Sequence, residues 1–273
     1  MDRGALFKAL GMALALSLGC VPEIPSVEHF ACAAGGACDA GQDGPDRPAL
    51  PLDAASSVDG AAATGCASYG ANALCNDFED AGALAGSWHL TGDGEVAVDR
   101  THGGGASLLL APPAPDGTRW LFSQLRTSST AALSPLKDLY VRAWVYLESA
   151  PRGDATLQLV QVMRQSFQVI AVVLTSSSVK VWNGVAQSIA ENRTLGLPIG
   201  RWACWELADV MTGTTTSWSL SLDGASVLEA KQETQSGFDS VRVGVYLPPA
   251  PVQPQIRAWI DDVVISDGPI GCP

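Results

Sequence analysis

The sequence has few histidines and few basic residues, and both shortages exclude classes of function. Its three histidines are scattered at positions 29, 89 and 102, and no cysteines or histidines have CxxC or HxxxH spacing, so no zinc site is predicted. The 16 Lys and Arg residues are outnumbered by 28 Asp and Glu residues and form no cluster. A surface that follows nucleic-acid phosphates needs such a cluster, so we expect no nucleic-acid partner.

Motifs of several enzyme classes are also missing. The sequence has no Gly-x-Ser-x-Gly nucleophile elbow and no phosphate-binding P-loop. The triple glycine at 103–105 precedes an apolar run, which predicts a loop before a strand rather than a phosphate cradle.

Long apolar runs are absent apart from one near the N-terminus. Residues 9–18 follow Arg3 and Lys8 and have the length of a signal-peptide core, which is too short to span a bilayer because spanning needs about 20 residues. The run ends in Leu-Ser-Leu-Gly-Cys, which resembles the bacterial lipobox, although Ser17 stands where that motif usually has Leu. Residues 1–20 therefore predict a lipoprotein-type signal peptide with a lipid on Cys20. Ordinary cleavage, with loss of Cys20, is the alternative.

The next segment is poor in large apolar residues. Residues 21–65 are rich in Ala, Gly, Pro and Asp, and they cannot bury enough surface to offset their ordering entropy. This composition predicts a disordered tether between the anchor and a folded domain at residues 66–273. We expect an exported protein, either a lipoprotein anchored in the cell envelope or outer membrane or an extracellular protein, with membrane contact only through the lipid.

Six cysteines remain when Cys20 is set aside, and an even number in an exported chain is typical of disulfides. They are Cys32, Cys38, Cys66, Cys75, Cys204 and Cys272. The first two and the next two are close in sequence, which favours two local pairs. The last two are then left for each other.

Short apolar alternations separated by turn residues predict strands throughout the folded domain. The expected strands are residues 106–110, 139–148, 156–163, 167–175, 179–182, 202–211, 217–223, 241–247 and 256–266. Asn183-Gly184 and Asp223-Gly224 are favoured hairpin turns, and no window has a helical period with caps. Many short strands at this spacing indicate an all-β sandwich or barrel.

Alternate residues of three expected strands sort into an aliphatic face and a face of rings and cations. The second face contains Tyr140, Arg142, Trp144, Tyr146, Arg242, Tyr246, Arg257 and Trp259. A sugar stacks its C–H face on Trp or Tyr, and Arg binds hydroxyls or a uronate carboxylate. If the three strands share a sheet, these residues form an open platform for a polysaccharide or other glycan. The alternative is that loops cover the face and make it a second core.

Four short stretches resemble the concanavalin A-like lectin/glucanase sandwiches, which include laminin-G-like modules and jelly-roll polysaccharide lyases and glucanases. They are Asp77-Phe78-Glu79-Asp80, His102-Gly103-Gly104-Gly105 with Ser107-Leu108, residues 140–147, and Trp259-Ile260-Asp261-Asp262-Val263-Val264. The resemblance covers about residues 75–272. It implies an all-β, two-sheet antiparallel jelly-roll sandwich whose concave sheet is the ligand platform.

The same resemblance implies a structural calcium ion (Ca2+). Related jelly-roll carbohydrate-binding modules hold this ion where their first and last strands meet, with carboxylates from a Phe-Glu opening and an Asp-Asp-Val closing. Calcium prefers six to eight oxygen ligands. The candidate ligands here are Glu79, Asp80, Asp261 and Asp262. Solvated strand ends are the alternative reading of these acids.

Catalytic patterns of the resembling families are missing. Retaining glucanases of this fold carry Glu-x-Asp-x-x-Glu, because their two reacting carboxylates lie about 5 Å apart, and Glu206 with Asp209 is the nearest approach. Lyases of the fold use Gln-x-His and a Tyr base, and no His follows a strand glutamine in that way. We therefore expect a non-catalytic carbohydrate-binding lipoprotein. A polysaccharide lyase or glycanase of the same fold, and a structural or protein-interaction lipoprotein, are the alternatives.

Overall fold

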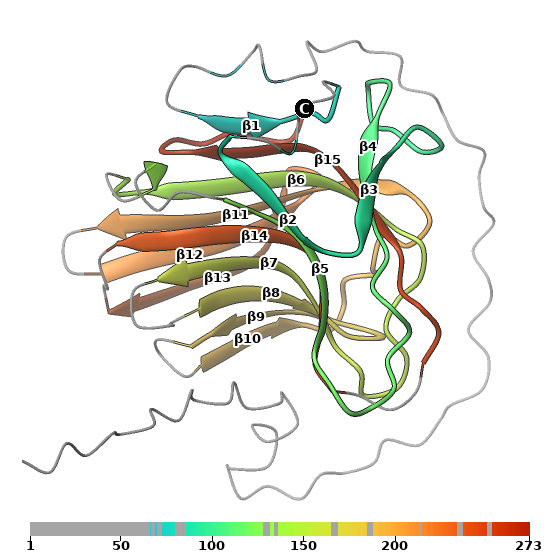
Figure 1. Cartoon of the computed structure of the whole chain (residues 1–273). Helices are drawn as coiled ribbons and strands as arrows, with labels where there is room; N and C mark the ends of the chain where they lie inside the picture. Colours follow the sequence, from blue (N-terminus) through green and yellow to red (C-terminus); the bar gives the residue numbers. More distant parts are fainter. Residues whose placement is uncertain are drawn as a thin grey trace, which may run out of the picture. The chain divides into compact units, whose positions relative to one another are not determined.

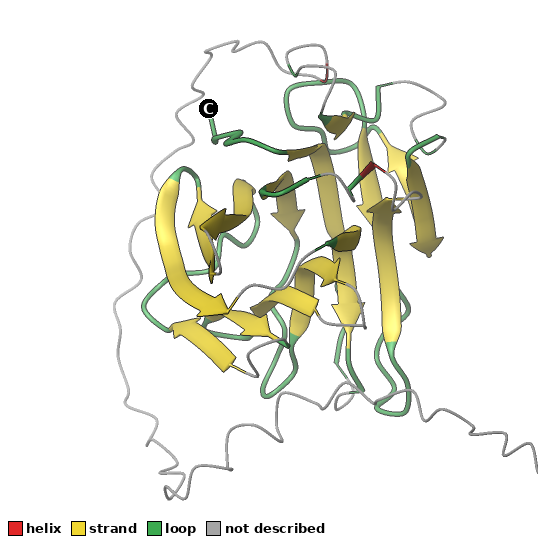
Figure 2. Cartoon of the chain, turned by 90° about the vertical axis from the view of Figure 1, so that its left-hand side faces the viewer, coloured by secondary structure: helices red, strands yellow, loops and turns green. Residues whose placement is uncertain are grey.

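The described part of the chain consists of strands and loops. The computed structural model describes residues 66, 69, 73–79, 84, 86–127, 132–133, 136–164, 169–184, 188–212, 215–233, 237–249 and 253–273. These residues contain 15 strands and no α-helix, and the short red segments in Figure 2 are 3₁₀ turns at residues 66 and 132. None of the described segments is a helix with the length and apolar character needed to cross a bilayer.

The strands form two antiparallel sheets. The eight-stranded sheet contains β1 (Leu74–Asn76), β3 (Gly94–Ala97), β4 (Ser107–Leu110), β6 (Leu139–Leu147), β11 (Trp202–Thr212), β12 (Thr215–Leu222), β13 (Ala225–Glu233) and β15 (Ala258–Ser266). The seven-stranded sheet contains β2 (Trp88–Gly92), β5 (Leu121–Thr127), β7 (Leu157–Arg164), β8 (Val169–Leu174), β9 (Val179–Asn183), β10 (Ser188–Asn192) and β14 (Phe238–Leu247).

The order of strands identifies a jelly-roll sandwich, as the sequence predicted. The first sheet has the order β13-β12-β11-β6-β15-β4-β3, with β1 also paired to β15. The second has the order β10-β9-β8-β7-β14-β5-β2, and Figure 1 shows β7 to β10 side by side.

Period-two alternation makes the core between the sheets. In β6, Leu139, Val141, Ala143, Val145 and Leu147 are each at most 4% exposed, and they belong to the same apolar cluster as the aliphatic residues of β7 and β14. Removing one such leucine side chain costs about 2–5 kcal/mol, because the lost contacts leave a cavity. Burial of one face of each strand therefore holds the two sheets together.

One ion pair crosses this core. The Arg164 guanidinium on β7 donates to the Asp209 carboxylate on β11, and both side chains are 1% exposed. The ring of Phe238 lies 4.9 Å from the guanidinium carbon. Burial raises the pKa of Asp209, and the charge of Arg164 opposes that rise. The pair therefore links the two sheets through two charged side chains that solvent does not reach.

Sequence patterns located nine strands correctly. Each expected range overlaps a strand, with ends that differ by no more than three residues. The Asp223-Gly224 turn between β12 and β13 is confirmed, because both residues have positive φ, 50° and 77°, as the favoured hairpin turn requires. Six further strands were not expected: β1, β2, β3, β5, β10 and β13.

The three ring-and-cation strands do not share one sheet, so the condition for the predicted platform is not met. β6 and β15 are neighbours in the eight-stranded sheet, whereas β14 lies between β7 and β5 in the other sheet. Alternation assigns side chains to the faces of a strand, but it does not say which strands pair. Arg242 and Tyr246 are thus separated from the other six residues of the predicted platform.

Two predicted disulfides are present. Cys66 and Cys75 have Cα atoms 5.4 Å apart, and the Cys204–Cys272 bond, with a sequence separation of 68, ties the C-terminal segment to β11. These bonds are typical of an exported protein. Several predictions lie outside the described residues: the signal peptide, Cys20, the tether at 21–65 and the Cys32–Cys38 pair.

Candidate functional site

A loop between β3 and β4 covers the outer face of the eight-stranded sheet. Its Arg100 guanidinium lies 3.8 Å from the centre of the Tyr146 ring and 4.7 Å from that of Trp259. Its His102 stacks on Trp144, with ring centres 3.7 Å apart. Trp259 is 1% exposed as a result. The rings on this face are therefore occupied by residues of the chain itself.

The C-terminal segment covers the same face from another side. Arg142 on β6 donates to the carbonyl oxygen of Gly271 at 3.3 Å, and its guanidinium lies 5.0 Å from the centre of the Tyr69 ring. Arg142 is 4% exposed, and the disulfide at Cys272 holds the segment beside it. The Arg142 guanidinium therefore holds the C-terminal segment against the sheet and does not face a ligand.

These contacts correct the predicted platform. Alternation placed one group of side chains on a common face correctly, namely Tyr140, Arg142, Trp144, Tyr146, Arg257 and Trp259. Arg257 is paired with Glu148 at 3.6 Å and lies 4.7 Å from the Trp259 ring. The loop and the C-terminal segment make most of this face a second core, which was the alternative considered from the sequence.

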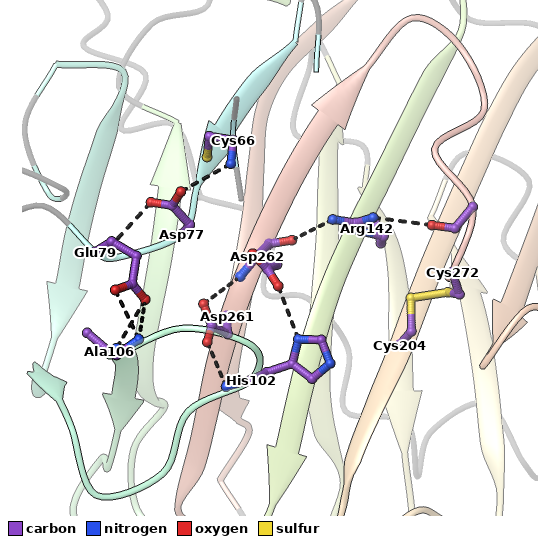
Figure 3. Close-up of polar contacts among 12 residues, drawn as sticks. Cys66, Asp77, Glu79, His102, Ala106, Arg142, Cys204, Asp261, Asp262 and Cys272 are labelled. Carbon is purple, nitrogen blue, oxygen red and sulfur yellow. Dashed lines mark hydrogen bonds and ion pairs between the residues drawn. A yellow bond between two sulfur atoms is a disulfide. The ribbon is translucent and has the colours of Figure 1, made fainter. Parts of the chain in front are cut away.

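The acids of the predicted calcium site lie where β15 changes partners. β15 pairs with β4 at residues 258–260 and with β1 at residues 263–265, and an irregularity in its pairing with β6 separates the two halves. Asp262 adopts a φ of 46° there. Figure 3 shows its carboxylate beside the His102 ring, with 3.1 Å between Oδ2 and Nδ1. The Asp261 carboxylate accepts the backbone N–H of His102 at 2.9 Å.

Carboxylates thus fasten the covering loop to the sheet. Glu79 accepts the backbone N–H groups of Gly105 at 2.8 Å and Ala106 at 3.1 Å. Asp261 also accepts the N–H of Asp262 at 2.8 Å. Burial raises the pKa of Asp261 to about 8, and the neighbouring Asp262 and Glu79 charges also raise it.

The fit of these acids to calcium is incomplete in the described part of the chain. No group of three or more His, Cys, Asp and Glu side chains there could hold a metal ion, and Asp80 lies outside it. Glu79 and Asp261 use carboxylate oxygens to accept N–H groups, whereas calcium needs several oxygens for itself. The calcium site therefore stays a prediction.

The outer face of the seven-stranded sheet presents a second set of polar and aromatic side chains. Directly opposed residues of an antiparallel pair project on the same side, so the register defines rows across the sheet. One row contains His89, Arg126, Arg242 and Gln161, and a second contains Phe122, Tyr246 and Gln158. The β5–β14–β7 face is the surface formed by Trp120, Phe122, Gln124, Arg126, Gln158, Gln161, Arg242 and Tyr246.

Two arginines lie opposite each other on this face. Arg126 on β5 is the register partner of Arg242 on β14. Both side chains are half-buried, and no described ion pair includes either of them. Burial lowers the pKa of Arg242, and the adjacent Arg126 charge lowers it further. The face therefore concentrates positive charge in a protein whose formal net charge is −12.

Three glutamine side chains form a chain of hydrogen bonds across the same face. Gln124 donates from Nε2 to Oε1 of Gln161 at 3.3 Å, and Gln161 donates from Nε2 to Oε1 of Gln158 at 2.6 Å. Gln158 and Gln161 share a face although they are three residues apart, because the register of β7 shifts between Gln158 and Val160. The three glutamines are at most 3% exposed, so their amides are fixed in orientation beneath the half-buried arginines and help to position them.

Aromatic rings gather at one end of the face. The rings of Trp120 and Phe122 both lie near that of Tyr246, with ring centres 5.2 Å and 6.4 Å from its centre. Phe122 is 41% exposed. Burial raises the pKa of the Tyr246 phenol, while the Arg242 charge opposes the rise. Flat rings that are partly open to solvent can stack against the C–H face of a sugar.

Sequence reasoning named only Arg242 and Tyr246 of this face. The missed residues on β5 are Phe122, Gln124 and Arg126, which point outward. The inward positions between them include Ser123 and Thr127. Because two inward positions are polar, the strand lacks the apolar alternation that marked the others. A search for outward alternation of rings and cations would have found it.

Comparisons with solved structures support the fold. The structure of "Cellulose induced protein, Cip1" is similar, with a TM-score of 0.56 and 17% sequence identity over 73% of this chain and 100% of that chain. A structure of botulinum neurotoxin type C, whose cell entry is described as dependent upon interaction with two ganglioside molecules, has a TM-score of 0.51 and 11% identity. That match covers 67% of this chain and 43% of the toxin chain. No family model and no curated protein sequence matches.

The chain is thus a disulfide-bonded jelly-roll β-sandwich with one covered and one partly open sheet face. Its likeness to these two structures is a likeness of fold.

Proposed function

We propose that this protein binds carbohydrate on the β5–β14–β7 face and does not cleave it. One observation carries the proposal: Trp120, Phe122 and Tyr246 lie on the same sheet face as hydrogen-bonded glutamines and two arginines without acidic partners among the described residues. Glycan sites combine ring stacking with a few oriented polar groups. This face provides both.

The fold shared with the botulinum neurotoxin type C structure, a toxin whose cell entry depends upon gangliosides, is consistent with this proposal. The described large hydrophobics that are exposed are few and dispersed: Val96, Val98, Phe122, Ile189 and Ile199. Scattered exposed hydrophobics are ordinary on a monomer surface, whereas a protein interface usually needs a continuous patch. A protein-interaction role is therefore the weaker alternative.

The lyase alternative requires an acid and a base that reach one bond. Tyr246 and His89 are the candidate pair on the open face. Tyr246 is opposite Phe122 on β5, and His89 is opposite Arg126 on the same strand. Four residues of β5 separate these two positions, so Tyr246 and His89 are offset by about 13 Å along the strand direction. The raised pKa of Tyr246 also disfavours a phenolate base. Binding without cleavage fits this arrangement better.

An immobilised glycan array tests the proposal. The wild-type protein should bind at least one glycan class, and Trp120→Ala and Phe122→Ala should each weaken binding about 3- to 10-fold, since a ring contact contributes about 0.5–1.5 kcal/mol. Val98→Ala is the control, because Val98 is 78% exposed and lies between β3 and β4, in the other sheet.

The array results separate the alternatives. A wild-type protein that binds no glycan contradicts the proposal, and so does unchanged binding by both ring variants. Unsaturated products that absorb in the ultraviolet, released from any bound polyuronate, would establish the lyase instead.

We also propose that the mature protein is tethered by a lipid on Cys20. The proposal rests on the signal-like residues 9–18 and the cysteine that follows them. Metabolic labelling with an alkyne fatty acid should mark wild type and not Cys20→Ala. A label on neither protein would support ordinary signal cleavage.

A further inference from the structure

We infer that the Arg126–Arg242 pair binds the carboxylate of an acidic sugar, so that the preferred ligand is a uronate-containing polysaccharide. This inference rests on the proposed carbohydrate binding. The two guanidinium groups come from directly opposed residues of neighbouring strands, which brings like charges close together. Like charges in this position are destabilising unless an anion lies between them.

The chain itself supplies no such anion among the described residues. Five described arginines have acidic partners, for example Arg164 with Asp209 and Arg201 with Asp223, whereas no described ion pair includes Arg126 or Arg242. The Nε atoms of Arg126 and Arg242 are buried and have no hydrogen-bond partner among those residues, which is also true of Arg100 and Arg142, whose guanidinium groups lie over aromatic rings. A bound carboxylate would provide acceptors in the planar arrangement that guanidinium groups match.

The neighbours of the pair favour a sugar acid over a small free anion. Gln161 is the register partner of Arg242 on the other side, and its amide is fixed by Gln124 and Gln158. The ring cluster around Tyr246 lies four residues further along β14. One extended ligand that contacts both ends must carry a negative group and a flat apolar face, which an acidic polysaccharide does.

The charge of the whole protein makes the inference specific. A formal net charge of −12 repels polyanions at long range, so general electrostatic attraction cannot supply the binding. Affinity for a polyuronate has to come from a local cationic site. Sulfated polysaccharides that lack uronate carboxylates should therefore bind poorly.

Calorimetric titration with paired polymers tests the inference. Polygalacturonate, alginate and hyaluronan are each compared with their carboxyl-reduced, neutral forms, and dextran sulfate reports general anion binding. We expect at least one polyuronate to bind ten times or more tightly than its reduced form and more tightly than dextran sulfate. Arg126→Gln and Arg242→Gln should each remove most of that difference.

Arg257→Gln is the matched control, because this arginine directly precedes β15 of the eight-stranded sheet and is paired with Glu148. It should bind like wild type. If a glutamine variant does not fold, Arg126→Lys and Arg242→Lys keep the charge and lose the planar fork, and each should still weaken polyuronate binding several-fold.

The outcomes separate this inference from the proposed function. Equal binding of acidic and reduced polymers, or binding only to neutral glycans of the array, overturns the inference and leaves the carbohydrate proposal intact. Binding to no glycan of any kind overturns both. Polyuronate binding that the Arg257→Gln change abolishes and the Arg242→Gln change spares would place the ligand on the wrong sheet and overturn the inference.

Discussion

The side chain of Gln124 on β5 donates a hydrogen bond to that of Gln161 on β7, although β14 lies between these strands. The residue of β14 opposite Gln124 is Gly244, which presents no side chain to the face. The amides can therefore meet above the intervening strand. The polar part of the β5–β14–β7 face thus depends on the local backbone of β14.

Gly244→Ala should destabilise the fold. Gly244 has a φ of +146°, and a Cβ there would lie 2.5 Å from the Ser123 carbonyl oxygen and 2.6 Å from Leu110 Cδ1. Backbone strain and overpacking of this kind cost about 3 kcal/mol. Urea unfolding measures the change. Gly196→Ala is the control, since nothing lies within 4 Å of a Cβ at 196, and a loss there as large as at 244 would contradict the account.

Asp209→Ala should destabilise the protein more than removal of a surface acid. The substitution removes the carboxylate that faces the buried guanidinium of Arg164, and breaking a buried pair in this way costs about 3–5 kcal/mol. Glu148→Ala breaks the half-exposed contact with Arg257 and should cost less than about 1 kcal/mol. Thermal and urea unfolding compare the two variants. Equal losses would show that the inter-sheet pair has no special role.

The disulfide at Cys204 and Cys272 should contribute more stability than the one at Cys66 and Cys75. Their sequence separations are 68 and 9 residues, and a longer closed loop removes more entropy from the unfolded chain. The paired alanine variants should lose about 4 and about 2.5 kcal/mol, respectively. The reverse order in urea unfolding would contradict the entropic argument.

Stability in a chelator should fall as the pH rises from about 4 to about 8. Burial raises the pKa of Asp261 to about 8, so the folded state keeps a proton that the unfolded chain has released above pH 4. The native state therefore binds more protons in this window, and the free energy of unfolding falls by at most about 1.4 kcal/mol per pH unit for this group. Asp261→Asn should remove most of this dependence of unfolding free energy on pH, while Asp154→Asn, at an exposed position, should leave it unchanged.

The same samples test the calcium prediction. Calcium added at pH 8 should raise the melting temperature of wild type and leave Asp261→Asn unchanged, because a bound cation would offset the repulsion among Asp261, Asp262 and Glu79. An unchanged wild type would show that these acids serve only to fasten the covering loop.

The sequence was sufficient to predict the architecture, because strand alternation, turn residues and cysteine spacing are local signals. The Asp223-Gly224 hairpin and the Cys66–Cys75 bond are examples. Alternation in β6 also identified its inward face correctly. These features depend on residues that are near each other in the chain, so they can be predicted without knowledge of the tertiary structure.

The site could not be predicted in the same way, because it depends on strand neighbours. The periodicity of β14 does not reveal that Arg242 lies opposite Arg126, 116 positions earlier in the sequence. Nor does the glycine run at 103–105 reveal that Arg100 and His102 cover Tyr146 and Trp144. Long-range register and loop packing decide which face is open.

Titration of the best glycan into Tyr246→Ala and Tyr140→Ala tests the central claim most directly. Both tyrosines are half-buried on outer sheet faces, Tyr246 on the seven-stranded sheet and Tyr140 on the eight-stranded sheet. We predict that Tyr246→Ala weakens binding about tenfold or more while Tyr140→Ala binds like wild type, with both variants folded. Loss of binding in Tyr140→Ala and retention in Tyr246→Ala would contradict the account.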